Sequence, residues 1–307
     1  MILSIGEILV DIFIDNNKKT VFPGGAPFNV ASNISNFNGD ISFYGAVGND
    51  EYGNLLSNFA NKKIKDVFID RINNRDTTQA IVTLDNGERS FKFVRDNGSD
   101  YLLDINNLSR FNLKDMKIIH IGSLMLSYKE GREFFYQAIK YIKDNTNALI
   151  SFDVNYRDDL FNSEAEAKEI FLSALKEADI IKFTEEELEL LSNKKDILEA
   201  LKSLLNDNQV AVVTLGKDGS IFYSKDLFIQ VPTYPLKPVD TTGAGDAFYS
   251  YFLYALDKGL DISHVDDIKD ALLRANVTGG LATQKKGAID VAPNLKEIEE
   301  FLSKYQK

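Results

Sequence analysis

Short apolar runs alternate along the chain with segments in which apolar residues recur at helical spacing. The runs are rich in β-branched residues, as the buried strands of a parallel sheet are. This pattern predicts strands at Ile2–Ile5, Ile41–Tyr44, Ile118–Ile121, Leu149–Phe152, Ile180–Phe183 and Val210–Thr214. It predicts helices at Ala26–Phe37, Tyr52–Asn61, Lys129–Lys143, Ala165–Glu177 and Asp196–Leu205, and mainly helices in the last third of the chain. Such alternation favours an α/β fold with helices on both faces of a mostly parallel sheet.

Residues 7–22 and 77–95 break this alternation. The second region alternates in polarity on both sides of Asp85-Asn86-Gly87, which is typical of a β-hairpin. We expect the two regions to form one small β-sheet that covers the main domain as a lid. Because the chain has no proline-rich linker, internal repeat or low-complexity tract, we expect residues 1–307 to form a single domain with this lid.

The charge balance limits the classes of partner. The 307 residues include 35 Lys and Arg against 46 Asp and Glu, a net charge of -11, so no broad attraction to nucleic acid or anionic lipid is expected. No apolar run approaches the roughly 20 residues of a membrane-spanning helix. The N-terminal stretch contains Glu7 and no basic start, so it does not resemble a signal peptide. We therefore expect a cytoplasmic protein that binds neither nucleic acid nor membrane.

The chain has no cysteine, and its two histidines are His120 and His264. Disulfides, thiolate metal sites and a cysteine nucleophile are therefore excluded. His120 ends an apolar run, a position that favours a structural histidine over a catalytic base. The chemistry is expected to rely on carboxylates, lysine, arginine and backbone groups.

Two glycines and an acid stand at the start of an apolar helix that begins near Gly245. The first N–H groups of a helix have no intrahelical acceptor, so Gly243-Ala244-Gly245 lets an anion approach the backbone closely. Asp246, in the same turn, is placed to accept a proton from a hydroxyl that attacks a phosphate. This motif indicates phosphoryl transfer to an alcohol. The alternative is a tight turn in which Asp246 only stabilises the helix N-terminus.

A second glycine motif, "GGAPFNVA" at 24–31, opens the first predicted helix. With "GAVGNDEYG" at 45–53 and "DTTGAGDAF" at 240–248, it resembles the paired signatures of the ribokinase-like carbohydrate kinases, the PfkB family. Further segments agree in order, namely "GEILVD", "FDVNYR", "ADIIKFTEEELELL", "VTLGKDG" and "GAIDVAP". Within this family the chain is most similar to bacterial fructokinases. It contains neither a P-loop nor the protein-kinase motifs.

The resemblance implies roles for residues on the acceptor side of the reaction. Asp246 would be the catalytic base, the N–H groups at 243–246 would steady the transferring phosphoryl group, and Arg157 would stabilise its charge. The positions implied to bind the sugar are Asp11, Gly24, Gly25, Asn29, Arg95 and Asn155. For Arg95 the alternative is a solvated charge at the end of a strand.

The resemblance also implies a nucleotide site, at Lys182, Thr184, Glu187, Thr214, Gly216, Lys217, Gly219, Ala275, Asn276 and Gly279. Glu187 would help to hold Mg²⁺ through water, and Asp240 and Thr242 would bind a potassium-like ion beside the anion site. Plainer alternatives exist for these positions. Acids after Thr184 are favoured at any helix start, residues 214–219 also suit a strand–turn–strand connection, and residues 275–279 also suit helix packing.

The implied function is ATP-dependent phosphorylation of a sugar hydroxyl, with the conversion of D-fructose to fructose 6-phosphate as the leading reaction. Phosphorylation of 2-keto-3-deoxygluconate, or of another sugar or nucleoside, is the alternative among enzymes. A non-catalytic sugar-binding protein on the same fold is the alternative from another class. The lid is also expected to pair two copies of the chain as a homodimer.

Overall fold

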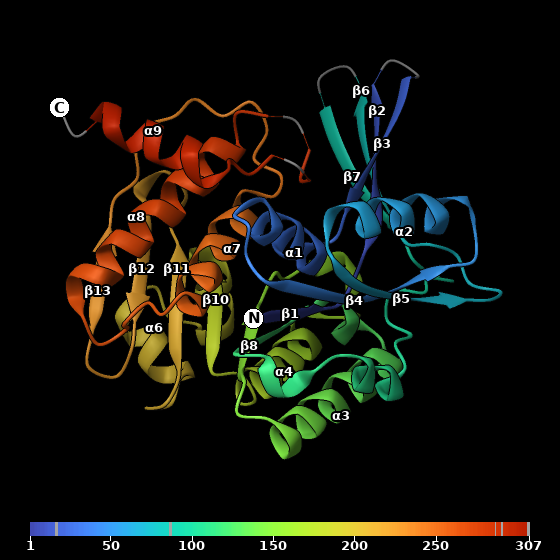
Figure 1. Cartoon of the computed structure of the whole chain (residues 1–307), viewed down its shortest axis with the longest axis horizontal. Coiled ribbons are helices and arrows are strands. Elements are labelled where there is room, and N and C mark those ends of the chain that lie inside the picture. The colour runs from blue at the N-terminus through green and yellow to red at the C-terminus, as the bar shows by residue number, and fades with distance from the viewer. Residues whose placement is uncertain (16–17, 86–87, 286, 290, 306–307) are drawn as a thin grey trace.

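A computed structural model describes residues 1–15, 18–85, 88–285, 287–289 and 291–305 (Figure 1). The predicted turn at Asn86-Gly87, and Asp290 of the "GAIDVAP" segment, lie outside the described residues.

Within the described residues, nine strands form the main sheet in the order β13-β12-β11-β10-β9-β8-β1-β4-β5. They are β1 (Ile2–Ile5), β4 (Ile41–Gly48), β5 (Asp66–Ile72), β8 (Ile118–Ile121), β9 (Leu149–Asp153), β10 (Ile180–Thr184), β11 (Val210–Thr214), β12 (Ser220–Tyr223) and β13 (Phe228–Val231). All neighbours from β11 to β5 pair in parallel, and β12 and β13 add an antiparallel edge. The carboxyl ends of the parallel strands therefore meet at one edge of the sheet.

Helices cover both faces of this sheet (Figure 1). They are α1 (Ala26–Asn36), α2 (Glu51–Lys63), α3 (Lys129–Asn145), α4 (Glu164–Leu175), α5 (Glu185–Ser192), α6 (Ile197–Leu204), α7 (Ala244–Asp257), α8 (Val265–Ala282) and α9 (Leu295–Tyr305). Leu3 packs in the cluster that includes α3 to α6, and Ile2 packs in the cluster that includes α1, α2 and α7 to α9. Because successive strand residues point to opposite faces, β1 is apolar throughout.

A separate four-stranded sheet has the order β3-β2-β6-β7. Its strands are β2 (Leu9–Asp15), β3 (Lys18–Gly24), β6 (Gln79–Asp85) and β7 (Glu88–Val94). Two antiparallel hairpins are joined at their centre by the parallel pair β2–β6, in which Asp11 lies opposite Ala80. Figure 1 shows this sheet standing beside α1 and α2. The predicted fold class is confirmed, and dimerisation through the small sheet stays a prediction.

The predicted elements are all present with small shifts at their ends, but β5 and β13 were not predicted, and β12 was predicted only as the strand that follows the turn at 214–219. β5 and β13 lie at the two edges of the main sheet, and β12 lies between β13 and β11. Charged residues interrupt β5, and none of its residues is fully buried. An edge strand keeps one side in contact with water, so it lacks the unbroken apolar run by which the central strands are recognised.

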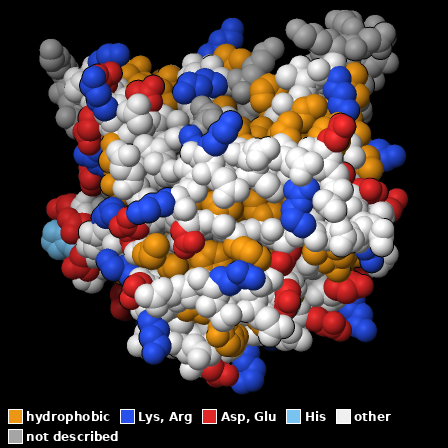
Figure 2. Space-filling model, turned by 45° about the vertical axis from the view of Figure 1, so that its right-hand side comes forward, with side chains coloured by type: hydrophobic (Ala, Val, Ile, Leu, Met, Phe, Trp, Pro, Cys, Tyr) orange, Lys and Arg blue, Asp and Glu red, His pale blue; other side chains and the backbone are white. Residues whose placement is uncertain are grey.

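Acidic and basic side chains are interspersed on the face shown in Figure 2, with apolar side chains between them. None of the helices in the described part of the chain is long and apolar enough to cross a membrane.

Candidate active site

A pocket of about 390 Å³ lies where the small sheet meets the carboxyl edge of the main sheet and the start of α7. It brings together residues predicted from segments far apart in the sequence. Those in its lining are Asp11, Gly25, Asn29, Asn155, Arg157, Lys182, Thr184, Glu187, Thr242, Gly243, Gly245 and Asp246. Pockets at the carboxyl ends of parallel strands are the usual ligand sites of open α/β sheets.

The start of α7 forms one wall of this pocket. Gly243 is the N-cap residue with φ 75°, and a Cβ atom there would lie 2.9 Å from the Cα atom of Ala288. Only glycine fits this turn without strain. Gly245 differs, because a Cβ atom there would meet only the Lys182 side chain, at 3.5 Å. The helix N-terminus therefore faces the pocket with an ammonium group beside it, a combination that suits an anion.

Asp246 sits in the first turn of α7 and is held by Asn29 of α1. The Nδ2 atom of Asn29 donates a hydrogen bond of 2.8 Å to Oδ2 of Asp246. Burial raises the pKa of Asp246 to about 6, although the Asn29 hydrogen bond, Lys182 and Arg157 act in the opposite direction. A carboxylate with a pKa close to neutrality is suited to accept a proton.

Asp11 lies on β2, on the side of the small sheet that lines the pocket. A Cβ atom at Gly24 would lie 2.2 Å from Oδ2 of Asp11, so this glycine makes room for the carboxylate. Gly25 has φ 107°, and a Cβ atom there would lie 2.4 Å from the carbonyl oxygen of Glu7. Burial, together with Asp246 and Asp240, raises the pKa of Asp11 to about 7. The paired glycines are thus required by the packing around Asp11 and the start of α1.

A buried ion pair lies beneath the start of α7. The Nζ atom of Lys182 is 2.8 Å from Oδ1 of Asp153, and both side chains are almost fully buried. The two residues are register partners on β10 and β9. Burial alone would lower the pKa of Lys182, but Asp153, Glu187 and Asp246 outweigh it and raise the pKa. The sequence analysis did not identify Asp153, although an acid that ends an apolar strand is a recognisable signal.

Glu187 is placed by a capping box at the start of α5. Thr184 accepts a hydrogen bond from the backbone N–H of Glu187, and Oε2 of Glu187 accepts one from the N–H of Thr184. Oε1 accepts another from the N–H of Tyr156, at 2.8 Å. Each oxygen keeps a further lone pair, which fits contact with Mg²⁺ through water. Among the described residues, no cluster of three or more acidic or histidine side chains could hold a metal directly.

Asp240 organises the loop before α7. Its Oδ1 atom accepts hydrogen bonds from the N–H and hydroxyl groups of Thr242, and its Oδ2 atom accepts one from the N–H of Gly287. Through these hydrogen bonds the Asp240 carboxylate stabilises the conformation of the loop. Coordination of a monovalent ion by the loop carbonyls stays a prediction.

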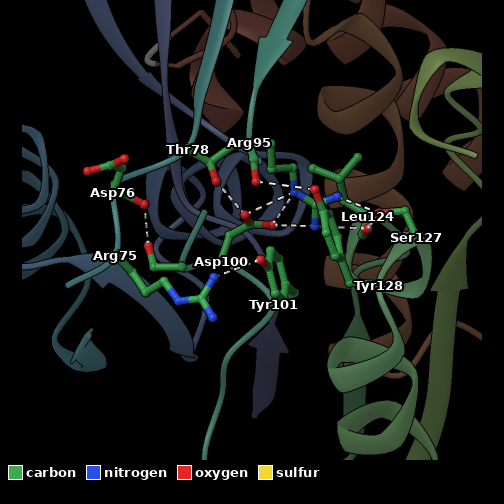
Figure 3. A network of polar contacts seen from close by, with 10 residues as sticks. Arg75, Asp76, Thr78, Arg95, Asp100, Tyr101, Leu124, Ser127 and Tyr128 are labelled. Atoms are coloured by element: carbon green, nitrogen blue, oxygen red, sulfur yellow. Dashed lines mark hydrogen bonds and ion pairs between the residues drawn. The ribbon is translucent and has the colours of Figure 1, made fainter. Parts of the chain in front are cut away.

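Arg95 does not line the pocket in the described structure. Its guanidinium is buried and paired with Asp100, with N–O distances of 2.7–3.1 Å. It also donates to the hydroxyl of Ser127 and to the carbonyl oxygen of Leu124, at the start of a short 3-10 helix, Leu124–Ser127. Figure 3 shows this network, with Tyr128 beside the guanidinium. The alternative of a solvated strand-end charge is therefore wrong, and sugar binding by Arg95 stays a prediction.

The remaining nucleotide positions also lie outside the lining of this pocket. Residues 214–219 form the predicted strand–turn–strand connection, with Gly216 and Gly219 at positive φ. Asn276 donates a hydrogen bond of 3.1 Å to the carbonyl oxygen of Val231. A Cβ atom at Gly279 would lie 3.0 Å from the carbonyl oxygen of Ala244, so this glycine permits close packing of α8 on α7. Nucleotide binding at Thr214, Lys217, Ala275 and these residues stays a prediction.

His120 is buried against Tyr249 and is 3.1 Å from the hydroxyl of Ser151. Burial lowers its pKa to about 4. The histidine is therefore neutral at pH 7 and lies in the core, as the structural interpretation predicts.

Comparisons with known proteins find relatives in sequence and in fold. A model of the pfkB family of carbohydrate kinases matches residues 1–295. The chain is 37% identical to probable fructokinase-5 of Arabidopsis thaliana over 100% of its own length and 98% of the relative. A fructokinase structure with bound ATP from Xylella fastidiosa superposes with a TM-score of 0.91 at 27% identity, covering 100% and 99% of the two chains. A Vibrio cholerae fructokinase structure with fructose, ADP and potassium ion bound gives a TM-score of 0.89 at 31% identity, covering 98% and 97%.

Proposed function

This chain belongs to the pfkB family of carbohydrate kinases, and we propose that its acceptor is D-fructose, which it converts to fructose 6-phosphate. As an ATP-dependent carbohydrate kinase, it transfers a phosphoryl group to a sugar hydroxyl. The observation that carries phosphoryl transfer to a hydroxyl is the hydrogen bond from Asn29 to Asp246 at the start of α7, inside a pocket that also holds Asp11. Fructokinases at moderate identity over the full chain support fructose as the acceptor.

Asp246 acts as the catalytic base in this proposal. Its carboxylate accepts the proton of the attacking sugar hydroxyl, and Asn29 fixes its orientation through the 2.8 Å hydrogen bond. The first N–H groups of α7 and the ammonium of Lys182 stabilise the negative charge of the transferring phosphoryl group. Arg157 lines the same pocket and adds a second cation. Asp11 and Asn155, also in the lining, hold sugar hydroxyls.

Metal ions contribute on the donor side. Glu187 would hold Mg²⁺ through water, and the ion would supply positive charge that neutralises the phosphates of ATP. A potassium ion would bind beside the start of α7 in this proposal, and the Vibrio cholerae fructokinase structure contains a potassium ion. Asp240 keeps the loop at that position in a fixed conformation. The small sheet closes over the pocket and excludes water from the γ-phosphate.

The experiment that tests the function is ADP release with ATP and Mg²⁺ across D-fructose, 2-keto-3-deoxygluconate, D-ribose, D-tagatose and a purine nucleoside. The expected result is fastest turnover with fructose, and faster turnover in potassium than in a large organic cation. A dominant signal from another acceptor would refute fructose while keeping the kinase. Equal turnover in the two cations would refute the potassium site.

The pH dependence of the reaction follows from the pKa of the base. Asp246 must be ionised to accept a proton, and its pKa is raised to about 6. The value of kcat/KM for the sugar should therefore rise with pH through about 6. Ionisation of Asp11, with a pKa of about 7, should extend this rise. A kcat/KM profile that is flat from pH 5 to pH 8 would contradict the assignment.

The two glycines at the start of α7 allow a matched pair of variants. Gly245→Ala should leave the unfolding temperature unchanged, because the added methyl meets only the Lys182 side chain at ordinary contact distance. It should lower turnover about 10²-fold by displacing the phosphoryl group. Gly243→Ala should destabilise the protein by about 1–3 kcal/mol, because it imposes strain at positive φ. Thermal unfolding and ADP release measure both effects, and full activity in Gly245→Ala would refute the anion site.

A further inference from the structure

Three polar side chains form a row across the main sheet, beneath the two helices whose first turns line the pocket. Ser4, His120 and Ser151 are register partners on β1, β8 and β9, and each is at most 1% exposed. They point to the face that α1 and α7 cover, because Ile2 and Ile118, two positions earlier on the same strands, pack in the apolar cluster of these helices. Polar groups buried at such an interface call for a specific explanation.

Hydrogen bonds join this row to both helices. The hydroxyl of Ser4 donates one of 2.8 Å to the carbonyl oxygen of Pro27, in the first turn of α1. On α7, the hydroxyl of Tyr249 lies 2.6 Å from that of Ser151 and donates to the carbonyl oxygen of Ile180 at 3.4 Å. The side chain of Tyr249 is fully buried. Each helix is therefore fixed to the sheet by hydrogen bonds near its N-terminus.

A single order of donors satisfies the contacts at α7. Because the Tyr249 hydroxyl donates to Ile180, its oxygen accepts from the hydroxyl of Ser151. The oxygen of Ser151 in turn accepts from Nδ1 of His120, at 3.1 Å. This order assigns the proton of the neutral imidazole to Nδ1, and burial, which lowers the pKa of His120 to about 4, keeps the ring neutral at pH 7. A fully satisfied buried network favours one arrangement of the elements it joins.

The Tyr249 contact lies one helical turn from the anion site. Gly245 and Tyr249 are four residues apart, so they share one face of α7. A Cβ atom at Gly245 would lie 3.5 Å from the Lys182 side chain, which donates a hydrogen bond of 2.8 Å to Asp153. Asp153 and Ser151 point to the same face of the sheet, because they are two positions apart on β9. Alternate residues of β9 therefore support successive turns of α7.

Apolar packing alone would fix the position of α7 less precisely. The burial of apolar surface has no preferred direction, and a phenylalanine at position 249 would bury nearly the same surface. A hydrogen bond, in contrast, sets both a distance and a direction. The proposed reaction needs this precision, because Asp246 and the first N–H groups of α7 must meet the sugar hydroxyl and the phosphoryl group together.

We propose that Tyr249 is a positioning residue for phosphoryl transfer, whose hydroxyl, bonded to Ser151, holds the first turn of α7 in place on the sheet. The inference rests on the proposed kinase function and deepens it. Tyr249 does not line the pocket, so it acts through the helix that carries the base and the anion site.

The first test is Tyr249→Phe, which should lower kcat about tenfold because the reacting groups are displaced. The KM values for sugar and ATP should be nearly unchanged, because the lining of the pocket is intact. Tyr44→Phe is the matched control. Tyr44 is also fully buried and donates a hydrogen bond of 2.6 Å to Asp70, but it packs on the opposite face of the sheet and does not line the pocket.

Thermal unfolding should show lower stability in both variants, with kcat reduced only in Tyr249→Phe. Equal kcat in the two variants, or a change in KM alone, would overturn the proposal. Ser151→Ala breaks the same contact from the sheet, so adding it to Tyr249→Phe should lower kcat no further than the more severe single variant. Losses of kcat that multiply in the double variant would also overturn the proposal. Should Tyr249→Phe fail to fold, Ser151→Ala is compared with Tyr44→Phe by the same criteria.

Hydrogen exchange separates this inference from the proposed function, because it needs no substrate. Peptides that cover the first two turns of α7 should exchange their amide hydrogens faster in Tyr249→Phe than in the wild type or Tyr44→Phe. Equal exchange in the three proteins would overturn the inference, even in an active kinase. A wild type without turnover on any sugar refutes the kinase, and the exchange comparison still decides whether Tyr249 holds α7 in place.

Discussion

Asp246→Asn should lower turnover about 10²–10⁴-fold while leaving sugar and ATP affinity nearly unchanged. The amide has the shape of the carboxylate, and its oxygen can still accept the hydrogen bond from Asn29. It cannot accept the proton of the attacking hydroxyl at neutral pH. Asp246 is half-buried, and removal of its charge relieves the desolvation that raises its pKa, so the variant should be at least as stable as the wild type.

ADP release measures the turnover of this variant, and calorimetric titration measures its affinity for each ligand. Asp267→Asn is a control for the same chemical change, because Asp267 lies exposed on α8 and does not line the pocket. Turnover within a fewfold of the wild type in Asp246→Asn would exclude this residue as the base. Normal turnover with lost sugar affinity would make it a binding residue instead.

Lys182→Met should both destabilise the fold and lower turnover. The substitution leaves Asp153 as a buried carboxylate without its cation, and breaking a buried pair in this way costs about 3–5 kcal/mol. It also removes the ammonium group beside Gly245, so turnover should fall about 10²–10³-fold, as when one preorganised donor to the transition state is lost. Urea unfolding and ADP release report the two effects separately.

The double variant Lys182→Met/Asp153→Leu separates stability from chemistry. Replacing both partners of a buried pair by apolar residues is often neutral, so the free energy of unfolding should return toward the wild-type value. Turnover should remain low, because the ammonium group is still absent. Recovery of activity together with stability would mean that Lys182 supports only the fold.

The sequence predicts those parts of the fold whose signal is local. Ile118–Ile121 is buried on both faces, so its apolar run predicts a central strand. In β5, at the sheet edge, charged residues interrupt the apolar run, so the sequence does not predict this strand. The turn at Gly243 and the acid at Asp246 are also local signals. Glycine adopts positive φ without steric cost, and an acid in the first helical turn is favoured by the helix dipole.

Contacts between distant segments explain what the sequence did not predict. The hydrogen bond between Asn29 and Asp246 joins positions 217 residues apart. The spacing of apolar and polar residues along the sequence does not predict such a contact. The pairing of Asp153 with Lys182 depends on the register of two strands. Arg95 stands at the end of β7 as predicted, but its direction depends on Asp100 and the Leu124–Ser127 helix.

The parallel pairing of β2 with β6 has a consequence for the order of folding. Each hairpin of the small sheet closes a short loop, but the β2–β6 pair joins Asp11 to Ala80 across the whole of β4, α2 and β5. Closing a long loop costs more entropy than closing a short one, and non-local pairings form slowly. We therefore expect the pocket wall that carries Asp11 to be completed only after β1, β4 and β5 have paired.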